Sequence, residues 1–161
     1  MKPPPAIIEI SRTVRSTLPS DTQIRKWARA ALGSQGSRAE LALRVVGAAE
    51  GRRLNLLWRG KDQPTNVLSF PAIDAATIGG RRLLGDIVLC APVIAREAKC
   101  QAKRLEQHYA HLVVHGCLHL LGYDHEDEVD AIRMERREKR ILKGLGFPDP
   151  YQFSLATTER V

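Results

Sequence analysis

The chain has 161 residues, of which 43% are hydrophobic and 27% charged, which is typical of one globular domain with a substantial core. The net charge of +7 favours polyanionic partners without identifying one. No apolar run approaches the roughly 20 residues that cross a bilayer, and the N-terminus has no signal-peptide pattern. We therefore expect a cytoplasmic, single-domain protein without membrane contact, flexible in its first few residues and at about 152–161.

Three cysteines, Cys90, Cys100 and Cys117, are scattered along the chain and form no CxxC motif. This spacing excludes a disulfide scaffold, a zinc ribbon and a thioredoxin-type redox motif. We expect three free thiols without a catalytic role.

Strand and helix patterns alternate through the first part of the chain. We expect a strand at 6–10, a helix at 21–32, a strand at 41–45 and a helix at 47–58. Ser20 can cap the first of these helices and Gly33 can end it. The strand at 41–45 is predicted from its alternation of larger apolar and smaller or polar residues.

The second part begins with a loop that Pro64 interrupts. We expect a short strand at 67–70, a loop at 72–82 with its turn at Gly79 and Gly80, a strand at 83–90, a helix opening near Pro92, an apolar helix at 110–121 and a charged helix at 126–142. Gly122 is placed to end the apolar helix.

All five histidines fall within residues 108–125. His115 and His119 are four residues apart, so on a helix they project from one face about one turn apart. Gly122 can adopt a left-handed conformation and reverse the chain, which brings His125 back beneath the helix end. Three neutral imidazoles with an open fourth position are typical of a catalytic zinc site.

Neighbouring residues leave alternatives open. A lone histidine in an apolar helix is usually structural, whereas the HxxxHxxGxxH spacing favours ligands. Cys117 lies about 200° around the helix from His115 and is assigned to packing. His111 either supports a metal ligand, faces substrate or has a structural role. For His108 we expect the structural role. Asp124 either caps the turn or orients a ligand histidine.

The same spacing occurs in metzincin metalloproteases, whose motif is HExxHxxGxxH. In those enzymes the glutamate takes a proton from metal-bound water, and Gly116 stands in its place here. Metal-activated water could still attack a phosphodiester, whose transition state an arginine would stabilise. Asp86 is a possible base from another strand, although a hydrogen-bonding role at a turn or strand end is the simpler interpretation.

Three blocks of sequence, HGCLHLLGYDH, RGKDQPTNVLSFP and LLGDIVLC, closely resemble the YbeY family of bacterial ribosomal-RNA maturation factors in order and spacing. The resemblance runs from about Leu54 to Tyr151. It implies an α+β, zincin-like fold, with a mixed sheet of about four strands and a metal-binding helix packed in the core. Trp58 and Cys117 stand where the family often has tyrosine and serine, and neither is a ligand position.

The resemblance also implies a metal-dependent, single-strand-specific endoribonuclease that processes the 3′ end of small-subunit rRNA, takes part in ribosome quality control and associates with the ribosomal small subunit. Within it, His115, His119 and His125 are the metal ligands and Arg59 is the functional arginine. A guanidinium at a loop edge can bind phosphate bidentately. The implied cofactor is one Zn²⁺ per chain, although three imidazoles also suit nickel or another divalent ion.

The segment IRMERREKR is more basic than the family resemblance predicts. It is either a solvated helix face with internal ion pairs or a surface that strengthens contact with RNA or a ribosomal protein. Two other functions stay open for the chain as a whole. One is a non-catalytic ribosome-assembly factor with a structural metal, and the other is a metallopeptidase, against which Gly116 and the basic charge count. The sequence does not show the native metal, the cleaved bond, the general base, the oligomeric state or the protein partner.

Overall fold

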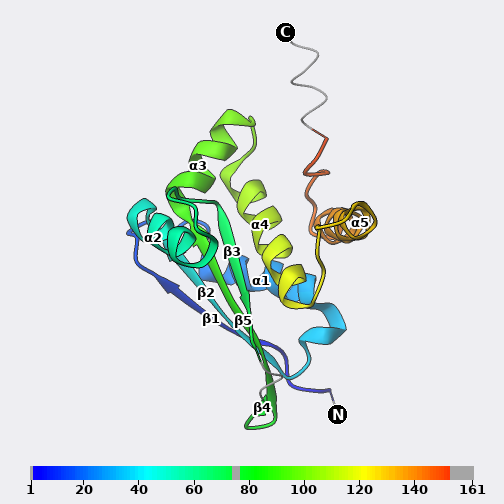
Figure 1. Cartoon of the computed structure of the whole chain (residues 1–161). Helices are drawn as coiled ribbons and strands as arrows, with labels where there is room; N and C mark the ends of the chain where they lie inside the picture. Colours follow the sequence, from blue (N-terminus) through cyan, green and yellow to red (C-terminus); the bar gives the residue numbers. More distant parts are fainter. Residues whose placement is uncertain (1, 74–76, 153–161) are drawn as a thin grey trace.

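A computed structural model describes residues 2–73 and 77–152. Four strands form the main sheet in the order β1-β2-β5-β3. The bounds are β1 Ile7–Arg12, β2 Ala39–Val46, β3 Val67–Pro71 and β5 Arg81–Cys90. β1, β2 and β5 run parallel, whereas β3 is antiparallel to β5. The sheet is therefore mixed, as the family resemblance implies (Figure 1). Of the C-terminal tail that was expected to be flexible, about 152–161, residues 153–161 lie outside the described residues.

The interpretation of 72–82 as an uninterrupted loop was wrong. A two-residue strand, β4 (Thr77–Ile78), pairs antiparallel with the start of β5, which begins two residues earlier than expected. Gly79 and Gly80 form the turn between β4 and β5, as predicted, and both have positive φ. The segment is short and glycine-rich, so it carries no period-2 pattern from which a strand could be predicted.

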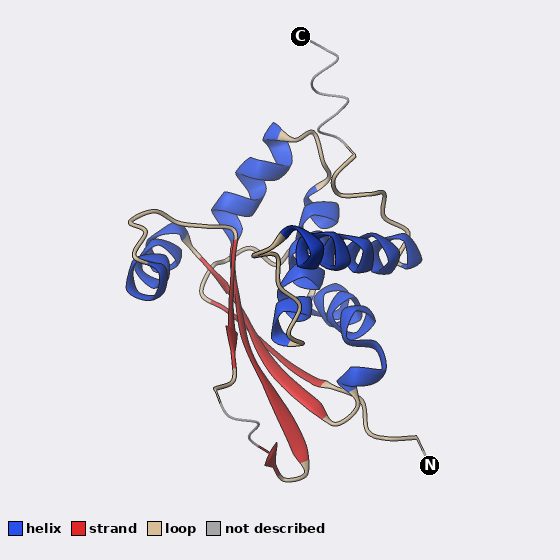
Figure 2. Ribbon diagram, turned by 45° about the vertical axis from the view of Figure 1, so that its right-hand side comes forward, coloured by secondary structure: helices blue, strands red, loops and turns tan. Residues whose placement is uncertain are grey.

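Five α-helices occur in the described residues: α1 Asp21–Leu32, α2 Ala48–Arg59, α3 Ala91–Cys100, α4 Leu105–Leu120 and α5 Glu128–Gly144. α1, α4 and α5 lie on one side of the sheet, and α2 lies on the other (Figure 2). The larger apolar cluster lies on the α4 side, with Ile87 and Leu89 of β5 among its members. Val88 and Cys90 of the same strand belong to the smaller cluster on the α2 side, as the alternation of side chains along a strand requires.

Local signals explain where most of these elements begin. Ser20 accepts from the backbone N–H of Gln23, and the Gln23 side chain bonds back to the Ser20 backbone, which is the capping box of a helix N-terminus. Pro92 lies in the first turn of α3, as expected. None of the described helices is long and apolar enough to cross a membrane.

α4 is the central helix of the larger cluster, and ten of its sixteen residues are buried. It begins at Leu105, five residues before the predicted start, because its first turn is polar and shows no apolar stripe. At Gly116, an added Cβ would lie 3.1 Å from Cγ2 of Ile87 and 3.3 Å from Oγ of Ser69. The missing side chain therefore lets α4 pack directly on β3 and β5.

Candidate metal centre

Two histidines of α4 meet on one face of the helix, as their spacing predicts. Nε2 of His119 lies 3.1 Å from Nε2 of His115, and the ring centroids are 4.6 Å apart. Both residues are partly buried. The fixed helix geometry therefore aims two ring nitrogens at a single point.

The turn after α4 brings in the third histidine. Gly122 has φ +100°, a conformation that favours glycine. The N–H of Gly122 bonds to the carbonyl of His119, and the N–H of Tyr123 bonds to the carbonyl of Leu118, which together form a Schellman motif. The ring of His125 then lies 5.5 Å from that of His115 and 4.9 Å from that of His119, centroid to centroid. The expected chain reversal at Gly122 is confirmed.

Asp124 lies within this turn, where its Oδ1 accepts the backbone N–H of His125 at 2.7 Å. This bond shapes the backbone that carries the histidine, and it fits the capping interpretation of Asp124.

The three imidazoles fit a transition-metal ion. One ligand nitrogen from each ring lies within 4.8 Å of the other two, and two nitrogens on a tetrahedral zinc ion are about 3.3 Å apart. One shared proton could bridge the lone pairs of only two of the three nitrogens, whereas a metal cation can bind all three lone pairs. Burial, together with the neighbouring His115 and His125, lowers the pKa of His119 to about 4, so this ring is neutral near pH 7, as a ligand must be.

A buried glutamate completes the surroundings of the histidines, and sequence reasoning missed it. The side chain of Glu138, from α5, is 0% exposed. Its Oε1 lies 2.6 Å from Nδ1 of His115 and its Oε2 lies 2.9 Å from Nε2 of His111. The hydroxyl of Tyr151 donates to the same Oε2 at 2.5 Å. One carboxylate therefore joins α4, α5 and the segment that follows α5.

Glu138 is ionised in this environment. Burial alone would raise its pKa, but hydrogen bonds and charge from His111 and His115 outweigh burial and lower the pKa of Glu138 to about 2. A sequence signal for Glu138 did exist. Met134, Glu138 and Leu142 are four residues apart and all buried, so a charged residue occupies the apolar stripe of α5.

His111 and His108 continue the stripe toward the start of α4. His111 contacts Glu138 and the ring of Tyr151, outside the group of three histidines. His108 is buried, and its Nε2 lies 3.0 Å from Oε1 of Glu97, which also accepts from the Asn66 side chain at 2.9 Å. His108 therefore links α4 to α3 and to the loop before β3, in line with its expected structural role.

Arg59 is the exposed last residue of α2, at the start of the loop that leads to the edge strand β3. Among the described residues, its guanidinium makes no hydrogen bond or ion pair. Two contacts hold the loop that follows it. Arg52 and Asp62 form a bidentate ion pair at 2.7 and 2.8 Å, and the Asn55 side chain donates to the carbonyl of Gln63 at 2.7 Å. The guanidinium is thus free to bind a ligand at the edge of a fixed loop.

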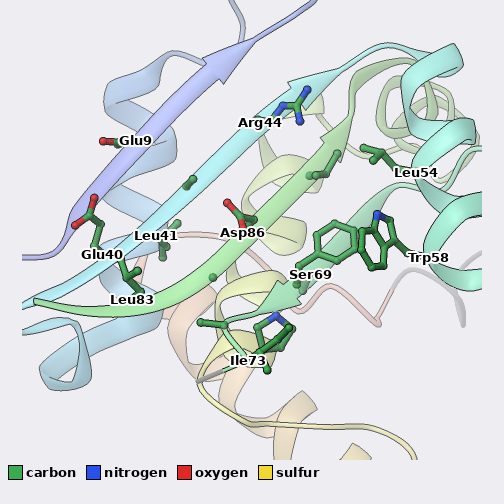
Figure 3. Close-up of a pocket in the computed structure, with 16 residues that line it drawn as sticks. Glu9, Glu40, Leu41, Arg44, Leu54, Trp58, Ser69, Ile73, Leu83 and Asp86 are labelled. Carbon is green, nitrogen blue, oxygen red and sulfur yellow. The ribbon is translucent and has the colours of Figure 1, made fainter. Parts of the chain in front are cut away.

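Asp86 lies away from the three histidines. It is exposed on β5 and lines a groove of about 800 Å³ on the α2 side of the sheet, together with Arg44 and Trp58 (Figure 3). The next residue, Ile87, faces α4 on the other side. The structure therefore does not bring Asp86 to the side of the sheet on which the histidines lie.

Comparisons with known proteins agree with the architecture. A family model described as Endoribonuclease YbeY matches residues 9–146. A protein named Endoribonuclease YbeY from Pseudomonas fluorescens is 50% identical over 144 residues, covering 89% of this chain and 95% of that protein. Another of that name, from Stenotrophomonas maltophilia, is 55% identical over 140 residues, covering 85% and 87%.

The solution structure of a protein from Thermotoga maritima matches 90% of this chain and 99% of its own, with a TM-score of 0.53 and 22% identity. At that identity the likeness concerns the fold alone. The family model matches most of the chain, and these relatives are 50% and 55% identical to it over 144 and 140 residues, so the chain belongs to the endoribonuclease YbeY family.

Proposed function

We propose that this protein is a metal-dependent endoribonuclease that cleaves single-stranded RNA and matures the 3′ end of small-subunit rRNA in the cytoplasm, in association with the small subunit. One observation carries the proposal: three imidazole nitrogens lie within 4.8 Å of one another in a chain whose relatives are named endoribonucleases. We further propose a zincin-like classification, with α4 as the metal-binding helix in the core.

The protein's own groups have separate tasks in this proposal. His115, His119 and His125 would hold a divalent cation, with zinc as the first candidate. When bound, such a cation supplies Lewis acidity and an activated water. Arg59, at the end of α2, binds the phosphate and neutralises charge that develops on its oxygens.

Position 116 favours RNA over peptide as the substrate. In a metzincin the corresponding glutamate takes the proton from water. Here a side chain at 116 would meet Ile87 and Ser69 of the sheet, so it could not reach the histidines. The net charge of +7 also favours a polyanion.

The outer face of α5 supplies positive charge for an RNA backbone. Its exposed basic residues are Arg133, Arg136, Lys139, Arg140 and Lys143. Four of them follow one another at spacings of three or four residues and therefore share one face. Changing Arg136 and Arg140 together to Gln should lower the slope of log affinity against log salt by about 1.4, because each lost contact to a single strand is worth about 0.7. Arg15→Gln with Lys26→Gln, two exposed cations outside α5, is the matched control.

The direct test is cleavage of a single-stranded RNA that spans the precursor 3′ end, with the same sequence as a duplex and with casein as comparison substrates. We expect zinc-loaded protein to cut only the single strand. Arg59→Lys should lower the rate about 10²-fold, the scale for losing a group that stabilises transition-state charge. Arg53→Lys, on the same helix and also exposed, should leave the rate within about twofold.

Three results would contradict the proposal. Undiminished cleavage by His115→Ala, purified free of other nucleases, would show that the three histidines are not the reaction centre. Full zinc occupancy without any RNA cleavage would instead favour an assembly factor whose metal is structural, and cleavage of casein alone would favour a peptidase.

A further inference from the structure

Glu138 occupies a position that is costly for a charge unless several donors surround it. A buried carboxylate without partners is strongly destabilising. Here two imidazole nitrogens and a phenol hydroxyl reach its two oxygens, at 2.6, 2.9 and 2.5 Å. An ionised carboxylate can only accept, so each of the three partners must donate. Within the described residues, Glu138 is the only acid among the fully buried side chains.

This requirement fixes the chemistry of one metal ligand. Because Nδ1 of His115 donates to Glu138, the neutral ring carries its free lone pair on Nε2. That atom is the one that faces His119 and lies 3.1 Å from its Nε2. Without the carboxylate, the proton of His115 could occupy either nitrogen, and the ring would lose its orienting contact.

Tyr151 fixes the carboxylate in turn. The segment that carries Tyr151 is anchored on three sides. Phe147 is buried with its ring T-shaped to that of Trp27, and Lys103 donates to the carbonyl of Pro150 at 2.8 Å. The Tyr151 ring itself packs against His111, with centroids 5.4 Å apart. The hydroxyl therefore reaches Oε2 from a fixed backbone.

From this geometry we propose that Glu138 and Tyr151 are positioning residues for the metal centre: Glu138 sets the tautomer and orientation of His115, and Tyr151 holds Glu138 in place. The proposal rests on the metal centre of the proposed function but not on its RNA substrate. Neither residue belongs to the group of three histidines that would hold the cation, and each acts through His115.

The test measures zinc affinity in the absence of RNA, by competition with a chromophoric chelator. Glu138→Gln keeps the shape but removes the charge, and it should weaken zinc binding about 10- to 100-fold, the usual effect of losing a partner of a metal-bound histidine. Tyr151→Phe acts one contact further away and should weaken binding less than tenfold. Glu135→Gln, the same substitution on the same helix at a partly exposed site, should leave the affinity unchanged.

A second readout separates positioning from general loss of structure. The ring ¹⁵N shifts of His115 in zinc-free wild-type protein should report a proton on Nδ1, and in Glu138→Gln they should move toward a mixture of tautomers. A Tyr151→Phe protein that unfolds like the wild type without zinc yet binds zinc more weakly would support positioning even if Glu138→Gln folds poorly.

Unchanged zinc affinity and unchanged His115 shifts in both variants would overturn the inference while leaving the proposed function standing. Failure of the proposed function alone would give a different result. If the wild-type protein binds zinc and the variants bind it more weakly, but RNA stays intact, the ribonuclease proposal fails and the positioning roles stand. Wild-type protein that binds no zinc at all would overturn both.

Discussion

The two faces of the sheet differ in how their charged side chains are stabilised. On the α4 side, Glu138 is fully buried and all of its partners are protein groups. On the α2 side, the groove leaves Glu9, Glu40 and Asp86 along a surface that is open to solvent. Buried charge requires fixed partners, whereas exposed charge is stabilised by water. The α4 side therefore fixes its charged and polar side chains in one geometry. The charged side chains of the groove side are stabilised without such fixed partners.

One stretch of sequence serves both faces. In LLGDIVLC, Asp86 faces the groove and the next residue, Ile87, packs beneath Gly116 of the histidine helix. Motifs that resemble one family in a single register need not form a single site, because alternate residues of a strand point in opposite directions. Substitutions on each face can test whether the two faces are as independent as this geometry suggests.

The largest expected effect is on stability in the presence of metal. Zinc that binds only the folded protein, at a free concentration 100 times its dissociation constant, should raise the free energy of unfolding by about 2.7 kcal/mol. Chelation should remove this increment, and His115→Ala should lack most of it at the same zinc concentration. Thermal unfolding with and without zinc measures both effects. An equal gain in wild type and variant would place the bound metal elsewhere.

Gly122→Ala should have the next largest effect on stability. The position has φ +100° and nothing within 4 Å of an added Cβ, so the cost is backbone strain of about 1–2 kcal/mol. Because this turn places His125, zinc affinity should fall as well. Gly60→Ala is the matched control, since Gly60 ends α2 at φ +70° with equally open space. It should cost similar stability, measured by urea unfolding, and leave zinc affinity unchanged.

Short-range signals explain how much of this structure could be predicted. The caps at Ser20 and Gly33, the proline of α3 and the glycine after α4 each act within a few residues of the element that they bound. The coming together of the three histidines likewise depends on one helix and one turn. These features are encoded within windows that sequence reasoning can read.

The features that were missed depend on contacts between distant segments. Glu138 lies 23 residues from His115 along the chain, and nothing local shows that α5 turns this side chain toward α4. The side of the sheet on which Asp86 lies depends on which faces α2 and α4 cover. Sequence reasoning could propose the three histidines as metal ligands. The apolar stripe of α5 marks Glu138 as a buried charge, but it does not show that this carboxylate meets His115.

Gly116→Ala tests the packing that separates the two faces. The added methyl would meet Ile87 at 3.1 Å. Overpacking of roughly 1–3 kcal/mol should outweigh the ~1 kcal/mol that alanine gains over glycine in a helix, for a net loss of about 1 kcal/mol. Gly144→Ala, in α5 with open space around it, should show only the gain. Urea unfolding of both variants decides the sign, and a stabilised Gly116→Ala would mean that α4 can shift on the sheet.

The smallest expected effect is that of Asp86→Asn on the metal centre. Asp86 is exposed on the groove side, where water and salt screen its charge. Zinc affinity should therefore stay within about twofold of wild type, measured by the same chelator competition at 0.15 M salt. A tenfold change would show that the two faces are coupled through β5, since Ile87, next to Asp86, is the residue that supports Gly116. Unchanged zinc affinity together with slower RNA cleavage would instead show that Asp86 acts after metal binding. That result would support Asp86 as a base, a role that its place on the sheet disfavours.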